Sequence, residues 1–439
     1  MTPMTTKGEK TTASAARGRH AQPNARRAIA GRLSWGLADQ AASSMSNFLV
    51  GMYVARSLGV AAFGVFSLVW VTYGVVLNVS RGLASDPLVV RFSGVPEASW
   101  RTAAARASGT ALGVGSAIGA ASLVAGLSLG GRAGAAFACL GVLLPGLLLQ
   151  DAWRFSFFAA GNGRKAFVND FVWGVALVPA LVVAARVGSV AGFVLAWGGT
   201  AALAAVYGCL QSGIRPQPTG MRAWLREQRD LGYRYLVENV GVSGASLLRA
   251  YGLGAIVGVS AVGVVRGVEL LLGPFLAVLM GLSLVTVPEA ARVLRQAPHR
   301  LGKFCLLLGG GLAAAALLWG AALLLVPDRL GEHGLGEVWR GASELIVPAS
   351  LGVAGAGLGV GAAAGLRALA SARRSLRCQL FASACYVGGG VGGAAVAGTV
   401  GSAWGVAAAN VSAAAVWWLQ LRSALRERRH NTIREVRTT

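Results

Sequence analysis

The stretch VARSLGVAAFGVFSLV, residues 54–69, places two glycines between long apolar runs. Gly59 and Gly64 are expected to let the backbone bend there, because glycine adopts conformations that other residues avoid. The chain can therefore leave one apolar helix and enter the next within a few residues. A closely similar stretch, GAIVGVSAVGVVRGV, recurs at 254–268. The two stretches predict a pair of equivalent helical hairpins in a duplicated architecture.

The composition is that of a membrane protein. Of the 439 residues, 55% are hydrophobic and 13% are charged, and the mean hydropathy is +0.60. Water-soluble domains usually carry about a quarter charged residues. Apolar runs of roughly 20 residues recur along the chain, and an α-helix of that length crosses a bilayer core of about 30 Å. We therefore predict an all-α polytopic membrane protein.

The formal net charge of +23 is spread in small packets between the apolar runs. A nucleic-acid-binding protein concentrates such charge on one folded face or one tail. Positive packets beside apolar runs are instead typical of membrane topology. We therefore expect the lipid bilayer as a partner, and no nucleic acid.

No pattern predicts a metal site or a cofactor. The five cysteines lie in or beside apolar runs without a CxxC pair, as expected of small buried side chains, and the four histidines are scattered in polar segments. The glycine-rich stretch 352–365 has no βαβ context, so its glycines are expected to let helices approach closely. No Walker A motif is present, so ATP hydrolysis by the usual machinery is not expected.

Windows of about 20 residues predict twelve spans. They lie near residues 33–55, 62–84, 105–129, 133–158, 166–185, 188–210, 233–256, 262–287, 303–326, 342–366, 377–398 and 400–421. The predicted parts are a basic N-terminal tail, 1–32, a lobe of six spans, 33–210, a linker, 211–232, a second lobe of six spans, 233–421, and a basic C-terminal tail, 422–439. The first apolar segment is too long for a secretory signal and is expected to remain as a helix.

The distribution of lysine and arginine supports this topology. Segments on one side of the predicted spans hold 31 of the 40 basic residues, and segments on the other side hold five. The remaining four lie within spans or at their ends. Cytoplasmic loops carry such an excess, so both termini are expected in the cytoplasm.

The second half repeats features of the first half in the same order. A shift of 199 residues lays Gly59, Gly64 and the pair Asp39–Gln40 over Gly258, Gly263 and the pair Glu238–Asn239. Shifts of 201 and 209 residues superpose Pro87 and Arg91 on Pro288 and Arg292, and Arg164–Lys165 on Arg373–Arg374. Six spans in each half give both halves the same orientation, related by an axis along the membrane normal. A substrate is then expected at the interface between the halves.

With these features, the sequence resembles the polysaccharide transporter branch of the multidrug/oligosaccharidyl-lipid/polysaccharide flippase superfamily. Members often carry the corner aR-x-L-G-P-x-x-Y/F-G-x-F/Y-x-L-A after the first helix. The matching residues are Arg56, Leu58, Gly59, Phe63, Gly64, Phe66 and Leu68, whereas Val60 replaces the usual proline and Ala61 or Ala62 the usual acid. The stretch QDAWRFSFFAAGNGRKAFVND, 150–170, also fits the family through its arginine and its basic turn.

The resemblance implies two helical lobes that form a V around a central cavity opening alternately to each side. The implied cargo is a polyprenyl-linked oligosaccharide or polysaccharide precursor, moved across the bacterial cytoplasmic (inner) membrane together with other proteins of cell-envelope polysaccharide assembly. A polar cavity would replace the hydration of the saccharide head, whose polar groups are costly in hydrocarbon. A proton or sodium gradient, the membrane potential and substrate supply all stay open as the driving force.

Polar residues inside the spans are the candidate cavity lining, because ionisable groups in a membrane normally face a cavity or a partner. The first span contributes Asp39, Ser43, Ser46 and Asn47, and the seventh contributes Glu238, Ser246 and Arg249, each set within one arc of its helix. The alternative for Asp39 and Glu238 is solvation or helix capping near the cytoplasmic ends of their helices.

Arg249 lies deeper in its span than the two acids. Its guanidinium can hold a phosphate or pyrophosphate through two parallel hydrogen bonds. Snorkelling to the outer interface or pairing within the protein are the alternatives.

Four further residues are secondary candidates: Arg81, Arg154, Arg266 and Glu269. Arg266 and Glu269 are three residues apart and are expected to form an internal ion pair, with cation coupling as the alternative. Asp151 has the same spacing from Arg154. Arg81 has Asn78 and Asp86 as polar neighbours along its own helix, so local structural pairing is favoured for these residues.

Two other functions remain open. An ion-coupled drug exporter of the same superfamily would share the architecture. A membrane polysaccharide polymerase, ligase or glycosyltransferase would need reactive groups in an outer loop. The largest outer loop, 327–341, is short but contains Asp328, Arg329, Glu332, His333 and Glu337. We expect a transporter without catalytic activity.

Overall fold

The computed structural model describes residues 45 and 47–438, and all regular structure in this part of the chain is helical. The first half contains a helix over 47–57, α2 (Val60–Ser80), the π-helical turn η1 (Arg81–Ser85), α3 (Asp86–Phe92), α4 (Glu97–Leu129), α5 (Gly131–Ala159), α6 (Gly163–Val187) and α7 (Val190–Ser212). The connection contains η2 (Pro218–Gly220) and α8 (Met221–Glu227). The second half contains α9 (Arg229–Ile256), α10 (Val259–Gln296), η3 (Pro298–Arg300), α11 (Leu301–Leu324), α12 (Asp328–Leu335), α13 (Val338–Glu344), α14 (Ile346–Ala368) and α15 (Ala372–Thr438).

The helices confirm the prediction of an all-α polytopic membrane protein. Within the described residues, nine helices are long and apolar enough to cross a membrane, with α15 counted once. α15 is two helices that meet at Ala397 and Gly398, where the backbone leaves the helical region. α9, with 28 residues, is also long enough to span but carries more charge. Residues 33–44 of the first predicted span lie outside the described residues.

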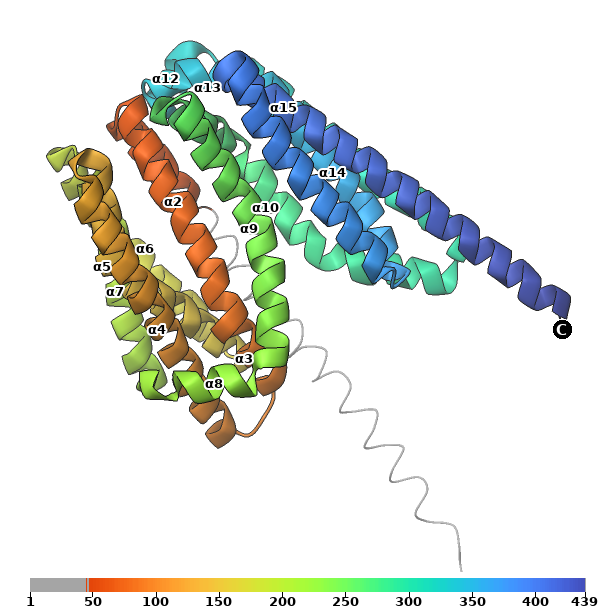
Figure 1. The fold of residues 1–439 in the computed structure, drawn as a ribbon, viewed down its shortest axis with the longest axis horizontal. Helices are drawn as coiled ribbons and strands as arrows, with labels where there is room; N and C mark the ends of the chain where they lie inside the picture. Colours follow the sequence, from red (N-terminus) through yellow and green to blue (C-terminus); the bar gives the residue numbers. More distant parts are fainter. Residues whose placement is uncertain (1–44, 46, 439) are drawn as a thin grey trace, which may run out of the picture.

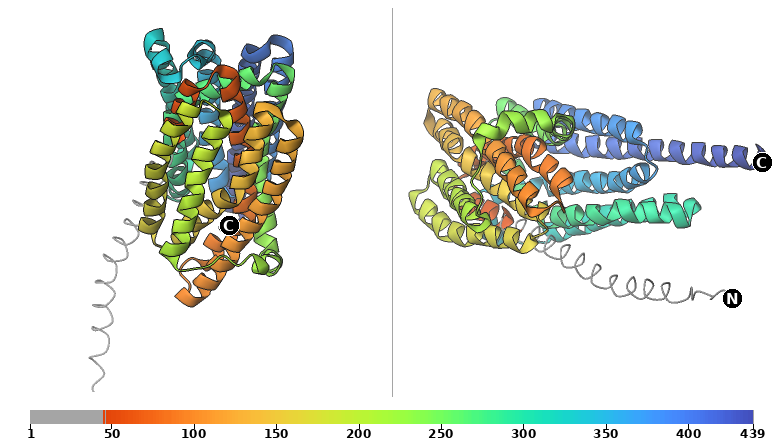
Figure 2. Two further views of the ribbon diagram at one scale, coloured as in Figure 1. Left: turned by 90° about the vertical axis from the view of Figure 1, so that its left-hand side faces the viewer. Right: turned by 90° about the horizontal axis from the view of Figure 1, so that it is seen from below.

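The helices form two bundles that meet at one end and diverge toward the other, as the views in Figures 1 and 2 show. We call the bundle of the first helix and α2–α7 the N-lobe, and that of α9–α15 the C-lobe. The end where the bundles meet is the joined pole, and the opposite end is the open pole. α9 runs beside α2 and also packs on α15, so it forms the side wall between the lobes.

At the joined pole, α2 and α10 cross through a pair of equivalent glycines. A Cβ at Gly64 would lie 1.8 Å from the Val259 carbonyl oxygen, and a Cβ at Gly263 would lie 2.4 Å from the Val60 carbonyl oxygen. Residue 64 corresponds to 263, and 60 to 259, under the shift of 199 residues. The repeated sequence therefore forms one reciprocal contact on the pseudo-two-fold axis.

This crossing corrects part of the expectation for the first corner. Gly64 lies inside α2 and serves the close approach of helices instead of the bend. Gly59 has φ −65° and ψ 163°, an extended conformation open to any residue. Only its counterpart Gly258, with φ 111°, occupies the region that favours glycine.

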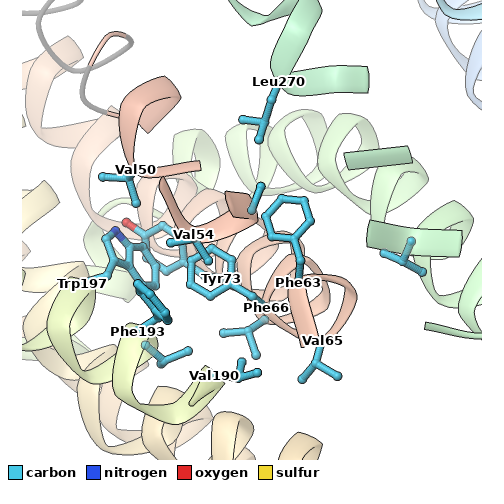
Figure 3. Packing of buried hydrophobic residues seen from close by; sticks show 14 of the residues in the cluster. Val50, Val54, Phe63, Val65, Phe66, Tyr73, Val190, Phe193, Trp197 and Leu270 are labelled. Carbon is cyan, nitrogen blue, oxygen red and sulfur yellow. The ribbon is translucent and has the colours of Figure 1, made fainter. Parts of the chain in front are cut away.

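An aromatic cluster joins α2 to α7 within the N-lobe. Tyr73 of α2 packs against Trp197 of α7, and Phe63 and Phe66 of α2 are buried in the same cluster as Phe193, as Figure 3 shows. The Tyr73 and Trp197 ring centroids lie 4.8 Å apart at an interplanar angle of 86°. Such edge-to-face pairs add about 0.5–1.5 kcal/mol each beyond burial. Apolar packing therefore ties α2 to α7 within the N-lobe.

The predicted outer loop folds as a compact cap at the joined pole. α12 and α13 bury Leu335, Val338 and Trp339, and the Trp339 Nε1–H donates to Asp328 Oδ1 at 2.9 Å. The cap reaches the N-lobe corner, where His333 Nε2 lies 3.4 Å from Arg56 Nη1. The cap thus belongs to the C-lobe and touches the N-lobe.

The connection between the lobes is anchored to the N-lobe at the open pole. The backbone N–H of Gln217 donates to the Ala105 carbonyl at 2.8 Å. Trp224 of α8 is buried, and its Nε1–H donates to the Leu83 carbonyl at 3.0 Å. Residues 213–228 therefore form a strap across the open-pole end of the N-lobe.

Glycines of the stretch 352–365 let α14 pack closely on both neighbours, as predicted. A Cβ at Gly361 would lie 2.3 Å from the Cys305 carbonyl oxygen of α11, and one at Gly355 would lie 2.9 Å from the Val411 nitrogen of α15. Helix association in membranes depends on such close approach of small residues.

Candidate functional site

A cavity of about 830 Å³ lies between the lobes. Its walls come from the first helix, the region around η1, α5, α9, α10, α14 and α15. Most of the lining is apolar, and a few charged and polar side chains converge in it. This combination is the usual character of a small-molecule or cofactor site.

Among the described residues, four arginines line the cavity, and they are the four that the predicted topology leaves inside the spans. They are Arg81 and Arg154 from the N-lobe, and Arg249 and Arg266 from the C-lobe. Each guanidinium carbon lies over an aromatic ring: Arg81 is 5.0 Å from the Phe155 centroid, Arg154 is 5.9 Å from Phe158, Arg249 is 5.4 Å from Tyr386 and Arg266 is 5.8 Å from Trp70. Such cation–π contacts contribute about 0.5–2 kcal/mol each.

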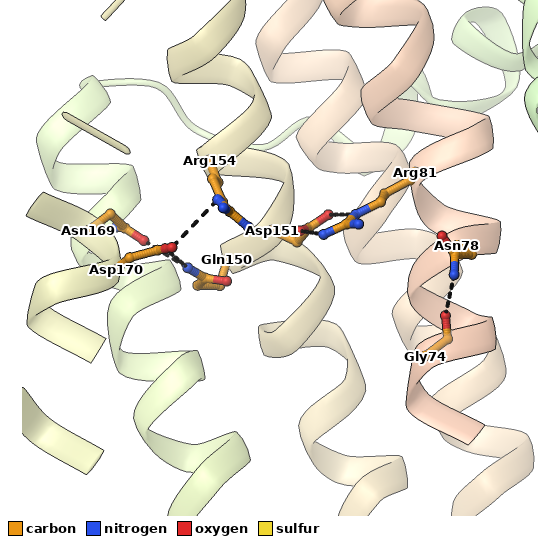
Figure 4. A network of polar contacts seen from close by, with 8 residues as sticks. All are labelled: Gly74, Asn78, Arg81, Gln150, Asp151, Arg154, Asn169 and Asp170. Atoms are coloured by element: carbon orange, nitrogen blue, oxygen red, sulfur yellow. Dashed lines mark hydrogen bonds and ion pairs between the residues drawn. The ribbon is translucent and has the colours of Figure 1, made fainter. Parts of the chain in front are cut away.

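The N-lobe arginines each have their own carboxylate, as Figure 4 shows. Arg81 donates two hydrogen bonds to Asp151, from Nε to Oδ2 at 3.0 Å and from Nη2 to Oδ1 at 2.7 Å. The Asp151 side chain is only 7% exposed. Arg154 Nε lies 3.5 Å from Asp170 Oδ2, and Asp170 also accepts from Gln150 Nε2 at 2.7 Å.

These pairs correct the expectation of local pairing. Asp151 makes its bidentate contact with Arg81, on the helix segment of α2 and η1, and Arg154 lies beside Asp170. Asp86 accepts a hydrogen bond from Asn239 of α9 at 2.8 Å. The wider π-helical turn begins at Arg81, and at Gly82 the α9 backbone approaches so closely that a Cβ would lie 2.7 Å from the Leu236 nitrogen. Tertiary packing of three helices therefore decides these partners.

The C-lobe arginines share one carboxylate. Arg249 Nη1 donates to Glu269 Oε1 at 3.1 Å, and Arg266 Nη1 donates to Glu269 Oε2 at 3.2 Å, so the predicted ion pair of Arg266 with Glu269 forms. Arg249 Nη1 also donates to the Tyr386 hydroxyl at 2.8 Å. The buried Arg249 Nε–H has no acceptor among the described residues. Within that part of the chain, the C-lobe pair carries one uncompensated positive charge.

A glycine run makes room for the buried arginine. A Cβ at Gly390 would lie 2.9 Å from Arg249 Cγ and 3.1 Å from Cδ. The first arm of α15 therefore presents backbone at the place where the aliphatic stem of Arg249 passes. Removal of this space would displace the guanidinium from Glu269.

The two arginine pairs lie at different depths. Arg81 follows the start of α2 at Val60 by 21 residues, which is about 30 Å of helix from the joined pole. Arg249 precedes the end of α9 at Ile256 by seven residues, and Arg266 follows the start of α10 at Val259 by seven, or about 10 Å of helix. The N-lobe pair lies toward the open pole, and the C-lobe pair lies at the closed end of the cavity.

The other predicted residues fall into three groups. Asn47 lines the cavity. Glu238 and Ser246 are exposed on α9 and are not among the described cavity-lining residues. Asp39 and Ser43 lie outside the described residues.

Sequence reasoning missed three contributors to the cavity region: Trp70, Tyr386 and Asn410. Trp70 contacts Arg266 from the opposite lobe, and Tyr386 accepts from Arg249. Asn410 lines the cavity and donates from Nδ2 to the Gly352 carbonyl at 3.1 Å. Asn410 is an amide inside an otherwise apolar span, and that signal could have identified it.

The described residues contain no group of three or more histidine, cysteine, aspartate or glutamate side chains arranged to hold a metal ion. In the cap, Glu332 Oε1 accepts from Arg340 Nε at 3.0 Å. Asp328 and Glu332 thus make contacts within the cap, and His333 lies beside Arg56.

No protein-family model matches the chain, and no curated protein matches it. Solved structures match over most of its length. An inward-facing multidrug resistance MATE family transporter of the MOP superfamily has a TM-score of 0.67 at 14% identity, covering 88% of this chain and 95% of that chain. The lipid II flippase MurJ in an inward closed conformation has a TM-score of 0.65 at 8% identity, covering 88% and 87%.

A MOP superfamily transporter from Pyrococcus furiosus Vc1 has a TM-score of 0.57 at 16% identity, covering 91% of this chain and 95% of that chain. At these identities the likeness concerns the fold. The chain therefore has the two-lobed helical fold seen in these transporter structures.

Proposed function

We propose that this protein is a flippase that moves a polyprenyl-linked oligosaccharide or polysaccharide precursor across the cytoplasmic membrane by alternating access. The observation that carries the proposal is the cavity itself, where four arginines converge and the deeper two share one carboxylate. A lipid-linked saccharide is joined through phosphate or pyrophosphate, whose charge matches such a site. Polar and aromatic side chains of the same walls would contact the neutral sugar hydroxyls.

Arg249 is the residue best suited to the phosphate. It is 8% exposed, and its Nε–H has no acceptor in the described part of the chain. A buried donor without a partner is unfavourable, so an acceptor supplied by a ligand gains more there than at the surface. Arginine also presents paired donors that fit a phosphate in a bidentate manner.

The path of the cargo follows from the two depths of the arginines. The basic segments at α3 and α8 lie at the open pole (Figure 1), so we propose that this pole and both termini face the cytoplasm. A phosphate entering there would pass the N-lobe pair and reach the C-lobe pair near the joined pole. Separation of the lobes at the Gly64–Gly263 crossing would then open the cavity outward, while the lipid tail stays in the bilayer.

An ion-coupled drug exporter of the same fold is the second candidate, because a multidrug resistance transporter is among the structures most similar to this chain. The charge of the cavity argues against a cationic drug, which would meet four guanidinium groups and three nearby carboxylates. For the transporter from Pyrococcus furiosus, reverse polarity of the binding pocket suggests a different function. Polarity of the pocket is therefore a reasonable basis for separating the two candidates.

Deletion of the gene in its host tests the proposal. We expect undecorated or cytoplasm-facing lipid-linked saccharide to accumulate, measured by mass spectrometry of extracted lipids, with unchanged sensitivity to cationic drugs. Drug sensitivity without lipid accumulation would favour the exporter.

Substitutions in the cap test an enzymatic role. Complementation by His333→Ala and Glu332→Gln should restore the lipid profile if the protein is a transporter. Failure of both variants, with normal membrane levels, would instead support catalysis in the cap.

A further inference from the structure

Glu269 occupies an unusual position in the cavity, because one carboxylate bridges two arginines from different helices. Its Oε1 accepts from Arg249 of α9, and its Oε2 accepts from Arg266 of α10. All three side chains line the same cavity. An anionic cargo that binds these arginines must therefore compete with Glu269 for the same donors.

We propose that Glu269 is a resident counter-anion, which the phosphate of the cargo displaces on binding and which recaptures both arginines to release the cargo. This inference rests on the proposed function and names the residue that sets affinity and release at that site. Without cargo, Glu269 lowers the cost of holding two arginines in the cavity. With cargo, its carboxylate turns into the open part of the cavity.

The exposure of the carboxylates supports this assignment. The Glu269 side chain is 36% exposed, whereas the Asp151 side chain, bound in a bidentate manner to Arg81, is 7% exposed. Glu269 makes one hydrogen bond to each arginine, so it can yield one donor at a time. A side chain with space beside it and two single hydrogen bonds exchanges partners more readily than a buried bidentate carboxylate.

Arg266 links this exchange to the lobes. Its guanidinium lies over Trp70 of the N-lobe, 5.8 Å from the ring centroid, while its own helix belongs to the C-lobe. A phosphate held by Arg266 is therefore in contact with a group that bridges the two lobes. When the lobes separate, Arg266 loses Trp70, and recapture by Glu269 is then the nearest compensation for its charge.

The test compares Glu269→Gln with Glu289→Gln in purified, lipid-reconstituted protein. Glu289 is a matched control: it lies on α10, pairs with Arg292 three residues later, has a 38% exposed side chain and lies outside the described lining of the cavity. The probes are inorganic pyrophosphate and a fluorescent polyprenyl pyrophosphate saccharide. Binding is measured by calorimetry, and translocation is measured in proteoliposomes.

We expect Glu269→Gln to bind pyrophosphate roughly tenfold tighter, because the ligand no longer displaces a charge-assisted hydrogen bond. We also expect its maximal translocation rate to fall several-fold, because release slows. A merely structural role would weaken binding or leave it unchanged, and either result in a folded variant overturns the inference. Glu289→Gln should keep the wild-type affinity and rate.

Two further arms keep the outcomes separate. If Glu269→Gln does not yield monodisperse protein, Glu269→Asp keeps the charge with a shorter reach, so affinity should rise by a smaller factor; unchanged or weaker binding contradicts the inference. If wild-type protein binds neither probe, the proposed function itself fails. Wild-type binding and translocation without tighter binding by the Glu269 variants would refute only the role of Glu269.

Discussion

At the joined pole the two lobes make the same contact twice, whereas at the cavity their arginines are paired differently. Gly64 and Gly263 each meet the carbonyl of the equivalent valine in the other lobe. In the cavity, by contrast, two N-lobe arginines have two aspartates, and two C-lobe arginines share Glu269. The equivalent glycines close the molecule at the joined pole, whereas the different pairing of the arginines leaves more positive than negative groups among the described residues of the cavity region.

This difference assigns separate roles to residues of the same type. The Arg81–Asp151 pair is a buried bidentate contact that joins α5 to the segment of α2 and η1. The Arg249 and Arg266 pair has fewer internal acceptors than donors in the described part of the chain. Stability should therefore depend on the first pair and anion affinity on the second.

The largest expected effect is on stability at the N-lobe pair. Arg81→Gln leaves the buried Asp151 without its partner, which should lower the free energy of unfolding by about 3–5 kcal/mol. The double variant Arg81→Gln/Asp151→Asn should recover most of this loss. Arg249→Gln should destabilise less, because Glu269 retains Arg266. Thermal unfolding in detergent checks all three, and equal losses for Arg81→Gln and Arg249→Gln would remove the distinction between the pairs.

The crossing at the joined pole provides the next effect. Gly64→Ala places a Cβ against the Val259 carbonyl, and such overpacking destabilises the closed contact by about 1–3 kcal/mol. We expect translocation to fall roughly tenfold, because that energy difference shifts the equilibrium between open and closed lobes. Gly74→Ala in the same helix is the control, since a Cβ there meets nothing within 4 Å. A wild-type rate of translocation by Gly64→Ala would show that transport does not require α2 and α10 to pack closely at this crossing.

A smaller effect is expected along the side wall between the lobes. The Thr72 hydroxyl and the Tyr251 hydroxyl share a hydrogen bond of 2.7 Å between α2 and α9. Thr72→Val should weaken this contact by about 1 kcal/mol, as for a typical hydrogen bond. Amide exchange of α9 should increase, whereas Thr102→Val, which loses only a bond within α4, should leave α9 unchanged. Equal amide exchange of α9 in the Thr72→Val and Thr102→Val variants would refute a role of the Thr72–Tyr251 hydrogen bond in joining the lobes.

The smallest effect concerns the surface of the open pole. The pKa of Asp230 lies below its ordinary value: desolvation is the largest single influence and raises it, but backbone N–H groups and the Arg91 guanidinium together lower it by more. A lowered carboxyl pKa stabilises the folded state above the ordinary pKa, and this contribution disappears as the pH falls through the lowered value. Asp230→Asn should therefore lower the melting temperature slightly at neutral pH and leave it unchanged in strong acid. A difference that grows on acidification would contradict this sign.

Much of the fold follows from the sequence. Hydropathy places α4–α7, α10, α11 and α14, and the break between the last two predicted spans falls where α15 turns at Ala397 and Gly398. The shift of 199 residues identifies the Gly64 and Gly263 crossing as equivalent. These features are periodic or repeated, so they can be recognised from the sequence alone.

The partners of the charged residues are less predictable. Spacing along one helix predicts the Arg266–Glu269 pair correctly, but it fails for Asp151, whose partner lies 70 residues away. Tertiary packing places α2, η1 and α5 side by side, and no local pattern encodes that choice. The same holds for Gly390, which makes room for Arg249 from a distant part of the chain.

Translocation by wild-type and Arg249→Gln protein in proteoliposomes tests the central claim most directly. The vesicles should contain either a fluorescent polyprenyl pyrophosphate saccharide or a cationic dye. We predict that the wild type moves the saccharide and not the dye, and that Arg249→Gln loses saccharide movement while remaining folded and inserted. Movement of the dye by the wild type, or undiminished movement of the saccharide by Arg249→Gln, would contradict an anion-selective cavity built on this arginine.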